Sequence, residues 1–296
     1  MALRLSAGTL YDAYLGLYTI QIFQEKRLAV SWELEKYTKK HYNITTTNQE
    51  GKMKDYTKLN AGSQVSANVD MGLRTYMLRI YKYMCLALVL TGAIAYFAGT
   101  SPEFASLMLT QTEAGFQPSG LFYVVAFAPL LPWAVYFFSH GRLSYQATHA
   151  VFWSYAALLG LSLFTVFMMY TGESVIRVFF ISSAVFGGMA LFGYTTKKDL
   201  SGVGSFLIMG MWGLVIATLV NMFLKSAALD FALSFIGVAI FTGLTAYMNQ
   251  QLKQIYYVVA GNPEEEGKAA VTGAMTLYIT FINLFLYLLR FFGDRR

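Results

Sequence analysis

Seven long apolar stretches constrain the fold of this chain more than any other feature. A helix that crosses a hydrocarbon core of about 30 Å needs about 20 mostly apolar residues. Unpaired backbone groups are too costly in lipid for an open sheet, and the apolar runs are continuous rather than alternating, which argues against a barrel. The sequence therefore predicts an all-α membrane protein with about seven transmembrane helices, at residues 81–99, 120–139, 149–170, 174–194, 206–224, 228–247 and 270–292.

Composition supports the same class of protein. Charged residues make up 13% of the chain and hydrophobic residues 56%, whereas soluble domains carry roughly 25% charged residues. The net charge of +6 comes from basic residues beside the spans, which is a topology signal rather than a nucleic-acid surface. The single cysteine, Cys85, lies within the first span and excludes a disulfide inside the chain.

The basic residues also predict an orientation. Lys197 and Lys198 follow the fourth span, and Lys253 and Lys268 follow the sixth. The first loop, by contrast, carries only acidic charges. Because positive loops stay on the cytoplasmic side, we expect the N-terminus on that side, which is the matrix in a mitochondrion. Three residues oppose this prediction: Lys225, Arg295 and Arg296.

Two local patterns predict how the spans pack. Pro129 and Pro132 fall within the second span and should kink it, because proline removes a helical hydrogen bond. Small residues spaced by four positions let helices approach closely. They occur in four spans, and we expect ordinary helix packing at each: Ala95/Gly99, Ala156/Gly160, Ala184/Gly188 and Ala239/Gly243.

Residues 1–75 form an N-terminal extension that differs from the membrane domain at 76–296. Apolar and aromatic residues recur at helical spacing between Leu10 and Ile22 and again near Trp32, which predicts one or two amphipathic helices. The polar stretch 39–66 predicts a linker. Aromatic residues are favoured at protein interfaces, so the candidates for docking a protein partner are Tyr11, Tyr14, Tyr18 and Trp32.

Three segments carry a resemblance to a known family. Residues 193–202 read GYTTKKDLSG and continue to Gly204, Ser205 and Phe206; residues 243–247 read GLTAY; and residues 281–285 read FINLF. With the seven-span layout, these segments resemble the Bax inhibitor-1 family, most closely its bacterial and mitochondrial branch. The resemblance covers about residues 70–296. It implies a seven-helix bundle with the last helix at its centre.

The resemblance also implies a functional site. Some family members are pH-sensitive calcium leaks, and others are described as regulators of cell death, of cristae organisation or of membrane-bound proteases. In the leak-type members two aspartates face each other, one after the Tyr of the sixth-span motif and one before the FINLF run. Paired carboxylates share a proton and suit Ca²⁺, which prefers hard oxygen ligands.

Neither aspartate is present in this chain. Met248 follows Tyr247 and Thr280 precedes Phe281, and neither side chain titrates near neutral pH or attracts a hard cation. These are degenerate ion-site positions, and we expect neither a metal nor a cofactor. A polar cluster remains nearby, formed by Asn249, Gln250, Gln251 and Asn283. We expect these residues to hydrogen-bond across helices and to keep the bundle closed. The alternative is that they line a neutral polar pore.

Enzymatic chemistry finds no support in the sequence. Ser205 in a Gly-Val-Gly-Ser run precedes a span and lacks a nearby histidine, so it is a poor match to a nucleophile motif. We therefore expect a non-enzymatic protein whose partners are the lipid bilayer and, through residues 1–75, proteins of a membrane complex, with no nucleic acid. Three functions remain: a structural or accessory subunit of a mitochondrial inner-membrane assembly, a calcium or proton leak with an altered gate, and a contact regulator of a membrane protease or of cristae shape. The bacterial inner membrane is the alternative location.

Overall fold

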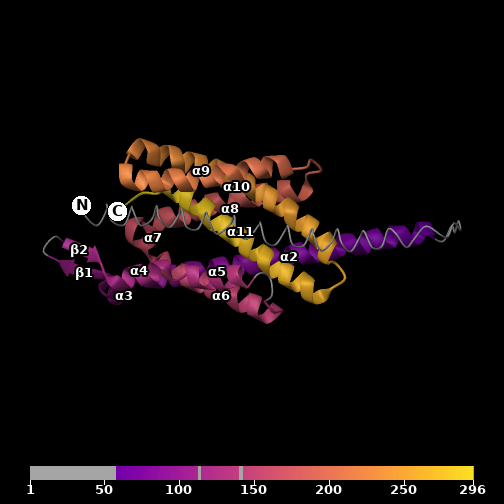
Figure 1. Cartoon of the computed structure of the whole chain (residues 1–296), viewed down its shortest axis with the longest axis horizontal. Coiled ribbons are helices and arrows are strands. Elements are labelled where there is room, and N and C mark those ends of the chain that lie inside the picture. Colours follow the sequence, from indigo (N-terminus) through magenta and orange to yellow (C-terminus); the bar gives the residue numbers. More distant parts are fainter. Residues whose placement is uncertain (1–57, 113–114, 140–142, 296) are drawn as a thin grey trace.

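The computed structural model describes residues 58–112, 115–139 and 143–295 (Figure 1). Seven helical segments in these residues are long and apolar enough to cross a membrane, which confirms the predicted number of spans. All but the second are longer than predicted, the first, sixth and seventh most of all, because their ends extend beyond the apolar stretch. The segments are Met71–Thr100, Gly120–Phe138, Tyr145–Met169, Gly172–Thr195, Ser201–Leu224, Ala227–Val259 and Pro263–Phe292.

The first span belongs to a single long helix, α2 (Lys58–Thr100). The prediction of a linker at 39–66 is therefore wrong for its last nine residues, which are helical. Once a helix is nucleated, each added residue gains a hydrogen bond at little further cost, and no proline interrupts this stretch. The remaining part of that linker lies outside the described residues.

A short helix and a two-stranded ribbon fill the first loop. Ser101 caps the start of helix α3 (Pro102–Met108), because its side chain accepts a hydrogen bond from the Phe104 amide. Strand β1 (Leu109–Thr112) then pairs antiparallel with β2 (Gly115–Pro118). This ribbon was not predicted. It lies between the first two spans, where water can satisfy the strand edges, which the bilayer core would not allow.

Two spans are interrupted. The second consists of α4 (Gly120–Phe127) and α5 (Leu130–Phe138), and the break at Ala128–Pro129 confirms the proline kink. The third consists of α6 (Tyr145–Ser162) and α7 (Phe164–Met169), which meet at Leu163. No proline marks this second break, and it was not predicted.

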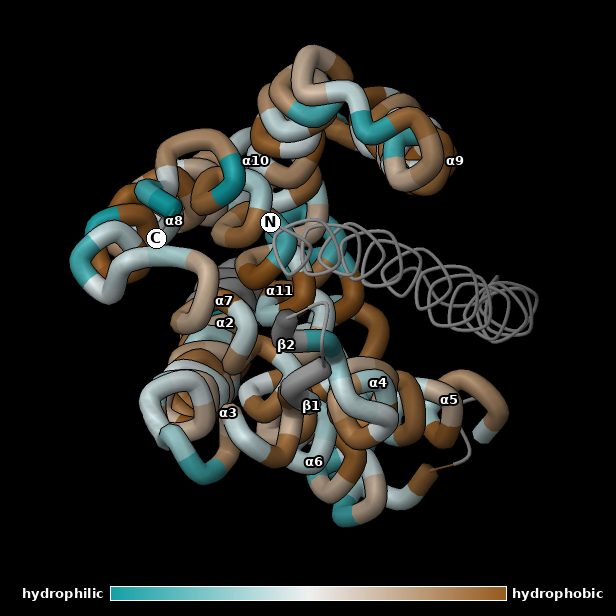
Figure 2. Tube along the Cα trace, turned by 90° about the vertical axis from the view of Figure 1, so that its left-hand side faces the viewer, coloured by the Kyte–Doolittle hydropathy of each residue, from teal (hydrophilic) through white to brown (hydrophobic). Residues whose placement is uncertain are grey.

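Four longer helices complete the bundle: α8 (Gly172–Thr195), α9 (Ser201–Leu224), α10 (Ala227–Val259) and α11 (Pro263–Phe292). Figure 2 shows α8, α9 and α10 on one side of the bundle, α2 to α6 on the other, and α11 between them. Helix α11 contacts α2, α6, α8 and α10. The most apolar stretch of α11 is 83% buried, against 28% for α8 and for α9, which confirms that the last helix is central.

Glycines decide where the helices come closest. A side chain at Gly193 on α8 would overlap the backbone of Ala246 on α10, whose Cα lies 2.8 Å from the position of the missing Cβ. Three of the four predicted small-residue pairs pack inside the bundle, because Gly99 meets Phe167, Gly160 meets Thr91 and Gly243 meets Leu207. The fourth prediction is wrong within this chain, since Gly188 meets nothing within 4 Å. It lies on the outward face of α8.

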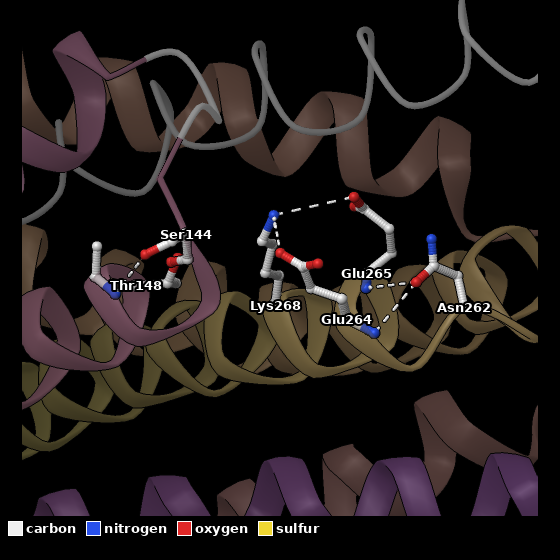
Figure 3. A network of polar contacts seen from close by, with 7 residues as sticks. Ser144, Thr148, Asn262, Glu264, Glu265 and Lys268 are labelled. Carbon is white, nitrogen blue, oxygen red and sulfur yellow. Dashed lines mark hydrogen bonds and ion pairs between the residues drawn. The ribbon is translucent and has the colours of Figure 1, made fainter.

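The two ends of the bundle are called inner and outer here, after the predicted orientation. The inner end holds residues 196–200 and the link between α10 and α11, and the outer end holds the ribbon and residues 293–295 (Figure 1). At the inner end, Asn262 caps α11 by accepting from the Glu264 amide at 3.2 Å, and Lys268 pairs with Glu264 at 3.1 Å (Figure 3). The acidic residues 264–266 thus form the first turn of α11, and the positive end of the helix dipole favours them there.

Candidate functional site

The two degenerate ion-site positions lie in the packed interface between α10 and α11. Met248 is 2% exposed and Thr280 is 0% exposed. The antiparallel register follows from two close approaches, Gly237 against Tyr287 and Gly273 against Leu252. This register places Met248 and Thr280 in the same stretch of the interface, about one helical turn apart.

The chemistry of these two side chains is neutral. The Thr280 hydroxyl donates to the carbonyl oxygen of Thr276 on its own helix at 2.8 Å. The Met248 thioether is a soft, uncharged group that is a poor ligand for a hard cation. Neither group changes charge between acid and neutral pH, so this pair does not offer the titratable carboxylates of the leak-type site.

Asn249 connects α10 to α2. Its side-chain oxygen accepts a hydrogen bond from the Tyr81 hydroxyl at 2.6 Å, and its amide nitrogen donates to the Thr245 carbonyl at 2.7 Å. Asn249 is fully buried, and a buried polar group without a partner is costly. A hydrogen bond across helices was expected for Asn249, but its partner Tyr81 was not predicted.

Gln250 holds the loop between α8 and α9. Its amide nitrogen donates to the Lys198 carbonyl at 2.7 Å, and its side-chain oxygen accepts from the Leu200 amide at 2.8 Å. One buried carboxamide thus satisfies two backbone groups of a conformationally irregular segment. The other two members of the predicted cluster lie apart from this loop: Asn283 donates to the Ile279 carbonyl at 2.9 Å, and Gln251 is half-buried on α10.

A lysine lies one turn beyond these residues. The Lys253 ammonium donates to the Tyr194 carbonyl at 3.4 Å and sits 5.7 Å from the centre of the Tyr194 ring. It therefore caps the end of α8, where a cation complements the exposed carbonyls. In the sequence Lys253 was only a topology signal. In the fold it places a positive charge at the inner end of α8, about one turn along α10 from Asn249.

The carboxylate in the loop between α8 and α9 is already engaged. The Asp199 side chain accepts a hydrogen bond from the Ser201 amide at 2.9 Å. Hydrogen bonds from Ser201 hold the pKa of Asp199 below its usual value of 3.8, despite a small opposing effect of desolvation. The carboxylate is ionised at neutral pH and stabilises the start of α9.

One carboxylate does lie between the last two helices, but at the opposite end. Asp230 on α10 forms an ion pair with Arg290 on α11. Asp230 precedes Met248 by 18 positions on the same helix, which is roughly 27 Å along the axis. Asp230 lies in the first turn of α10, and nothing in the sequence predicted its pairing with Arg290. The docking candidates Tyr11, Tyr14, Tyr18 and Trp32 lie outside the described residues.

The fold and the site define a class of protein: a seven-span helical membrane bundle with a buried last helix and buried, hydrogen-bonded polar side chains towards the inner end of α10. A family model described as an inhibitor of apoptosis-promoting Bax1 matches residues 73–296. The chain therefore belongs to the Bax inhibitor-1 family. The N-terminal residues before 73 lie outside the match.

Bacterial membrane proteins are among the relatives. The chain is 47% identical to an uncharacterized protein of Rickettsia prowazekii over 244 residues, which is 82% of this chain and all of that protein. It is 44% identical to an uncharacterized protein of Caulobacter vibrioides, over 81% of this chain and 97% of that one. It is also 40% identical to the inner membrane protein YbhL of Escherichia coli K12, over 76% of this chain and 94% of that protein.

Proposed function

We propose that this protein is a non-enzymatic, non-conducting member of its family that acts by contact, as an accessory subunit of a membrane assembly. The proposal rests on the burial and the neutral chemistry of the two degenerate ion-site positions. Met248 and Thr280 are buried and neutral, and the Thr280 hydroxyl is engaged with its own helix. A bare divalent ion in such an interface would lose its hydration without gaining anionic ligands, which costs several kcal/mol or more.

The surrounding contacts also favour a closed bundle. The hydrogen bond between Tyr81 and Asn249 holds α2 against α10, and Gln250 holds the loop that joins α8 and α9. Opening a path between these helices would expose or break contacts that are now satisfied. The ammonium of Lys253 adds an electrostatic barrier for cations at the inner end.

Calcium flux into liposomes tests the proposal. We expect the unmodified protein to pass Ca²⁺ no faster than protein-free liposomes at neutral and at mildly acid pH, with an added ionophore as the positive control. The double variant Met248→Asp/Thr280→Asp restores the two carboxylates and should admit Ca²⁺ in a pH-dependent way. Its matched control is Met248→Asn/Thr280→Asn, which has similar volume but no charge. A pH-dependent flux through the unmodified protein would favour the altered leak instead.

The N-terminal extension provides the contact in this proposal. Its aromatic residues are the docking candidates named above, and the described part of α2 runs from Lys58 to Thr100. Deletion of residues 2–57 removes all four docking candidates of the extension and leaves the first transmembrane span, Met71–Thr100, complete. We expect the truncated protein to reach the membrane but to lose stoichiometric copurification with its assembly. Copurification that survives the deletion unchanged would place the contact elsewhere.

The proposed location is an inner membrane. We propose the mitochondrial inner membrane with the N-terminus in the matrix, and the bacterial inner membrane is the alternative, which the bacterial relatives support. Both locations put Lys197 and Lys198 on the side where positive loops are retained. Fractionation combined with protease protection of a tag at the N-terminus tests the compartment and the orientation together.

A further inference from the structure

The outer end of α11 is joined to two different helices by two ion pairs. Arg290, in the last turn of α11, pairs with Asp230 near the start of α10. Asp294, just beyond α11, pairs with Arg177 near the start of α8 at 2.7 Å. The central helix is therefore attached on both sides at the same end of the bundle.

The two pairs differ in their exposure to solvent. The Arg290 side chain is 3% exposed and that of Asp230 is 27% exposed. The Arg177 and Asp294 side chains are 50% and 67% exposed. Salt screens exposed charges much more than buried ones, so the two pairs should respond differently to ionic strength. Phe231 and Phe291 pack 5.0 Å apart between ring centres beside the buried pair.

Backbone contacts reinforce the attachment to α8. The Asp294 amide donates to the Ser174 hydroxyl at 2.9 Å, and the Thr171 amide donates to the Asp294 carbonyl at 3.1 Å. The Arg295 guanidinium lies 6.0 Å from the centre of the Tyr170 ring. Residues 293–295 thus run along the short link between α7 and α8, and together with the two ion pairs they form a continuous set of contacts.

Gly293 makes this close approach possible. A Cβ at this position would meet the Tyr170 ring at 2.7 Å. With a side chain at position 293, residues 293–295 would have to move away from the link between α7 and α8. The absence of a side chain at Gly293 is therefore part of the attachment.

We propose that the Asp230–Arg290 and Arg177–Asp294 ion pairs form an outer latch, which keeps α11 between α8 and α10 and must open before the outer end of α11 can move. The exposed pair is the salt-sensitive half of the latch and the buried pair is the salt-resistant half. The latch lies at the opposite end from Met248 and Thr280, so it does not depend on whether the protein conducts ions.

Amide hydrogen exchange of the protein in lipid nanodiscs tests the exposed half. We expect Arg177→Asp and Asp294→Arg each to raise exchange of the Thr171 and Asp294 amides by about tenfold, and the double swap to restore most of the protection. Asp294→Asn, in the exposed tail, removes the charge with little change of shape and should give a smaller increase. The matched control is Arg79→Asp, which breaks the inner-end pair with Glu266 at 3.7 Å and should leave exchange at the outer end unchanged.

Two further measurements separate the halves of the latch. High salt should accelerate exchange of the Thr171 and Asp294 amides while the first turns of α10 stay protected. Asp230→Arg should expose the start of α10 to exchange, and Asp230→Arg/Arg290→Asp should protect it again. Unchanged exchange in Asp294→Arg, insensitivity to salt, or a failure of the double swaps to restore protection would overturn the proposal. Amide exchange does not depend on calcium flux, so these outcomes are distinct from those that test the proposed function.

Discussion

The contact between α8 and α10 gives a sharp test of the packing, because two glycines of α8 face opposite surroundings. Gly193 lies against the backbone of Ala246, and a Cβ there would overlap the Ala246 carbonyl oxygen and approach its Cα to 2.8 Å. Gly188, five positions earlier on the same helix, meets nothing within 4 Å. The same substitution, glycine to alanine, should therefore have opposite effects at the two positions.

The expected magnitudes follow from two effects. Alanine stabilises a helix interior relative to glycine by up to about 1 kcal/mol at either position. At Gly193 the added methyl group also meets backbone that has no flexible end to move aside, and overpacking of this kind costs about 1–3 kcal/mol. We expect Gly188→Ala to be neutral or stabilising by up to ~1 kcal/mol. Gly193→Ala should be less stable than Gly188→Ala by about 1–3 kcal/mol.

Reversible unfolding in mixed micelles, followed by circular dichroism as the denaturing detergent fraction rises, measures this difference. Gly193→Leu extends the series, because a larger side chain at the same position should lower the free energy of unfolding further. If Gly193→Ala matched or exceeded the stability of Gly188→Ala, overpacking against Ala246 would be refuted. That result would mean that α8 and α10 can separate locally at no cost.

Three further predictions concern the inner end and the lipid-facing surface. Gln250→Leu should leave the Lys198 carbonyl and the Leu200 amide unsatisfied, at about 1–3 kcal/mol each if they stay buried, and hydrogen exchange of residues 196–202 should rise far more than in the matched variant Gln251→Leu. The Asp199 carboxyl should titrate below its usual pKa because of its hydrogen bonds from Ser201. Its stabilising effect is therefore present above the unfolded-state pKa and is lost as pH falls through the lower folded-state value, which an NMR titration of the wild type beside Asp199→Asn would detect. Cys85 is exposed on the bundle surface within the first span, so an apolar maleimide should label it in liposomes, whereas equal labelling by a charged, water-soluble maleimide would contradict its membrane placement.

Much of the fold was predictable from the sequence because lipid imposes one strong rule. Every backbone polar group in the bilayer must be satisfied within its own segment, so apolar stretches of sufficient length identified all seven spans. The proline break between α4 and α5 was predictable for a similarly local reason, since proline cannot donate a backbone hydrogen bond. The break at Leu163 had no such local signal. Residues 58–66 have a polar composition that masks their continuity with α2.

The candidate site was predictable only as a set of residue types. The sequence determined that Met248 and Thr280 are neutral, and no fold can give them a charge. It did not determine that Asn249 would bond to Tyr81, or that Gln250 would hold the loop at 198–200. Those partners are far apart in the chain, and only the antiparallel packing of the helices brings them together.

The helix faces illustrate the same division. Gly188 and Gly243 occur in equivalent small-residue pairs, yet one faces outward and the other meets Leu207. Spacing along a helix fixes which residues share a face, but the neighbouring helices decide which face is buried. Asp230 and Arg290 show this most plainly. The sequence determined two charges near span ends, and the tertiary structure made them an ion pair. The physical reason is that attraction between charges depends on their distance in space rather than on their separation along the chain.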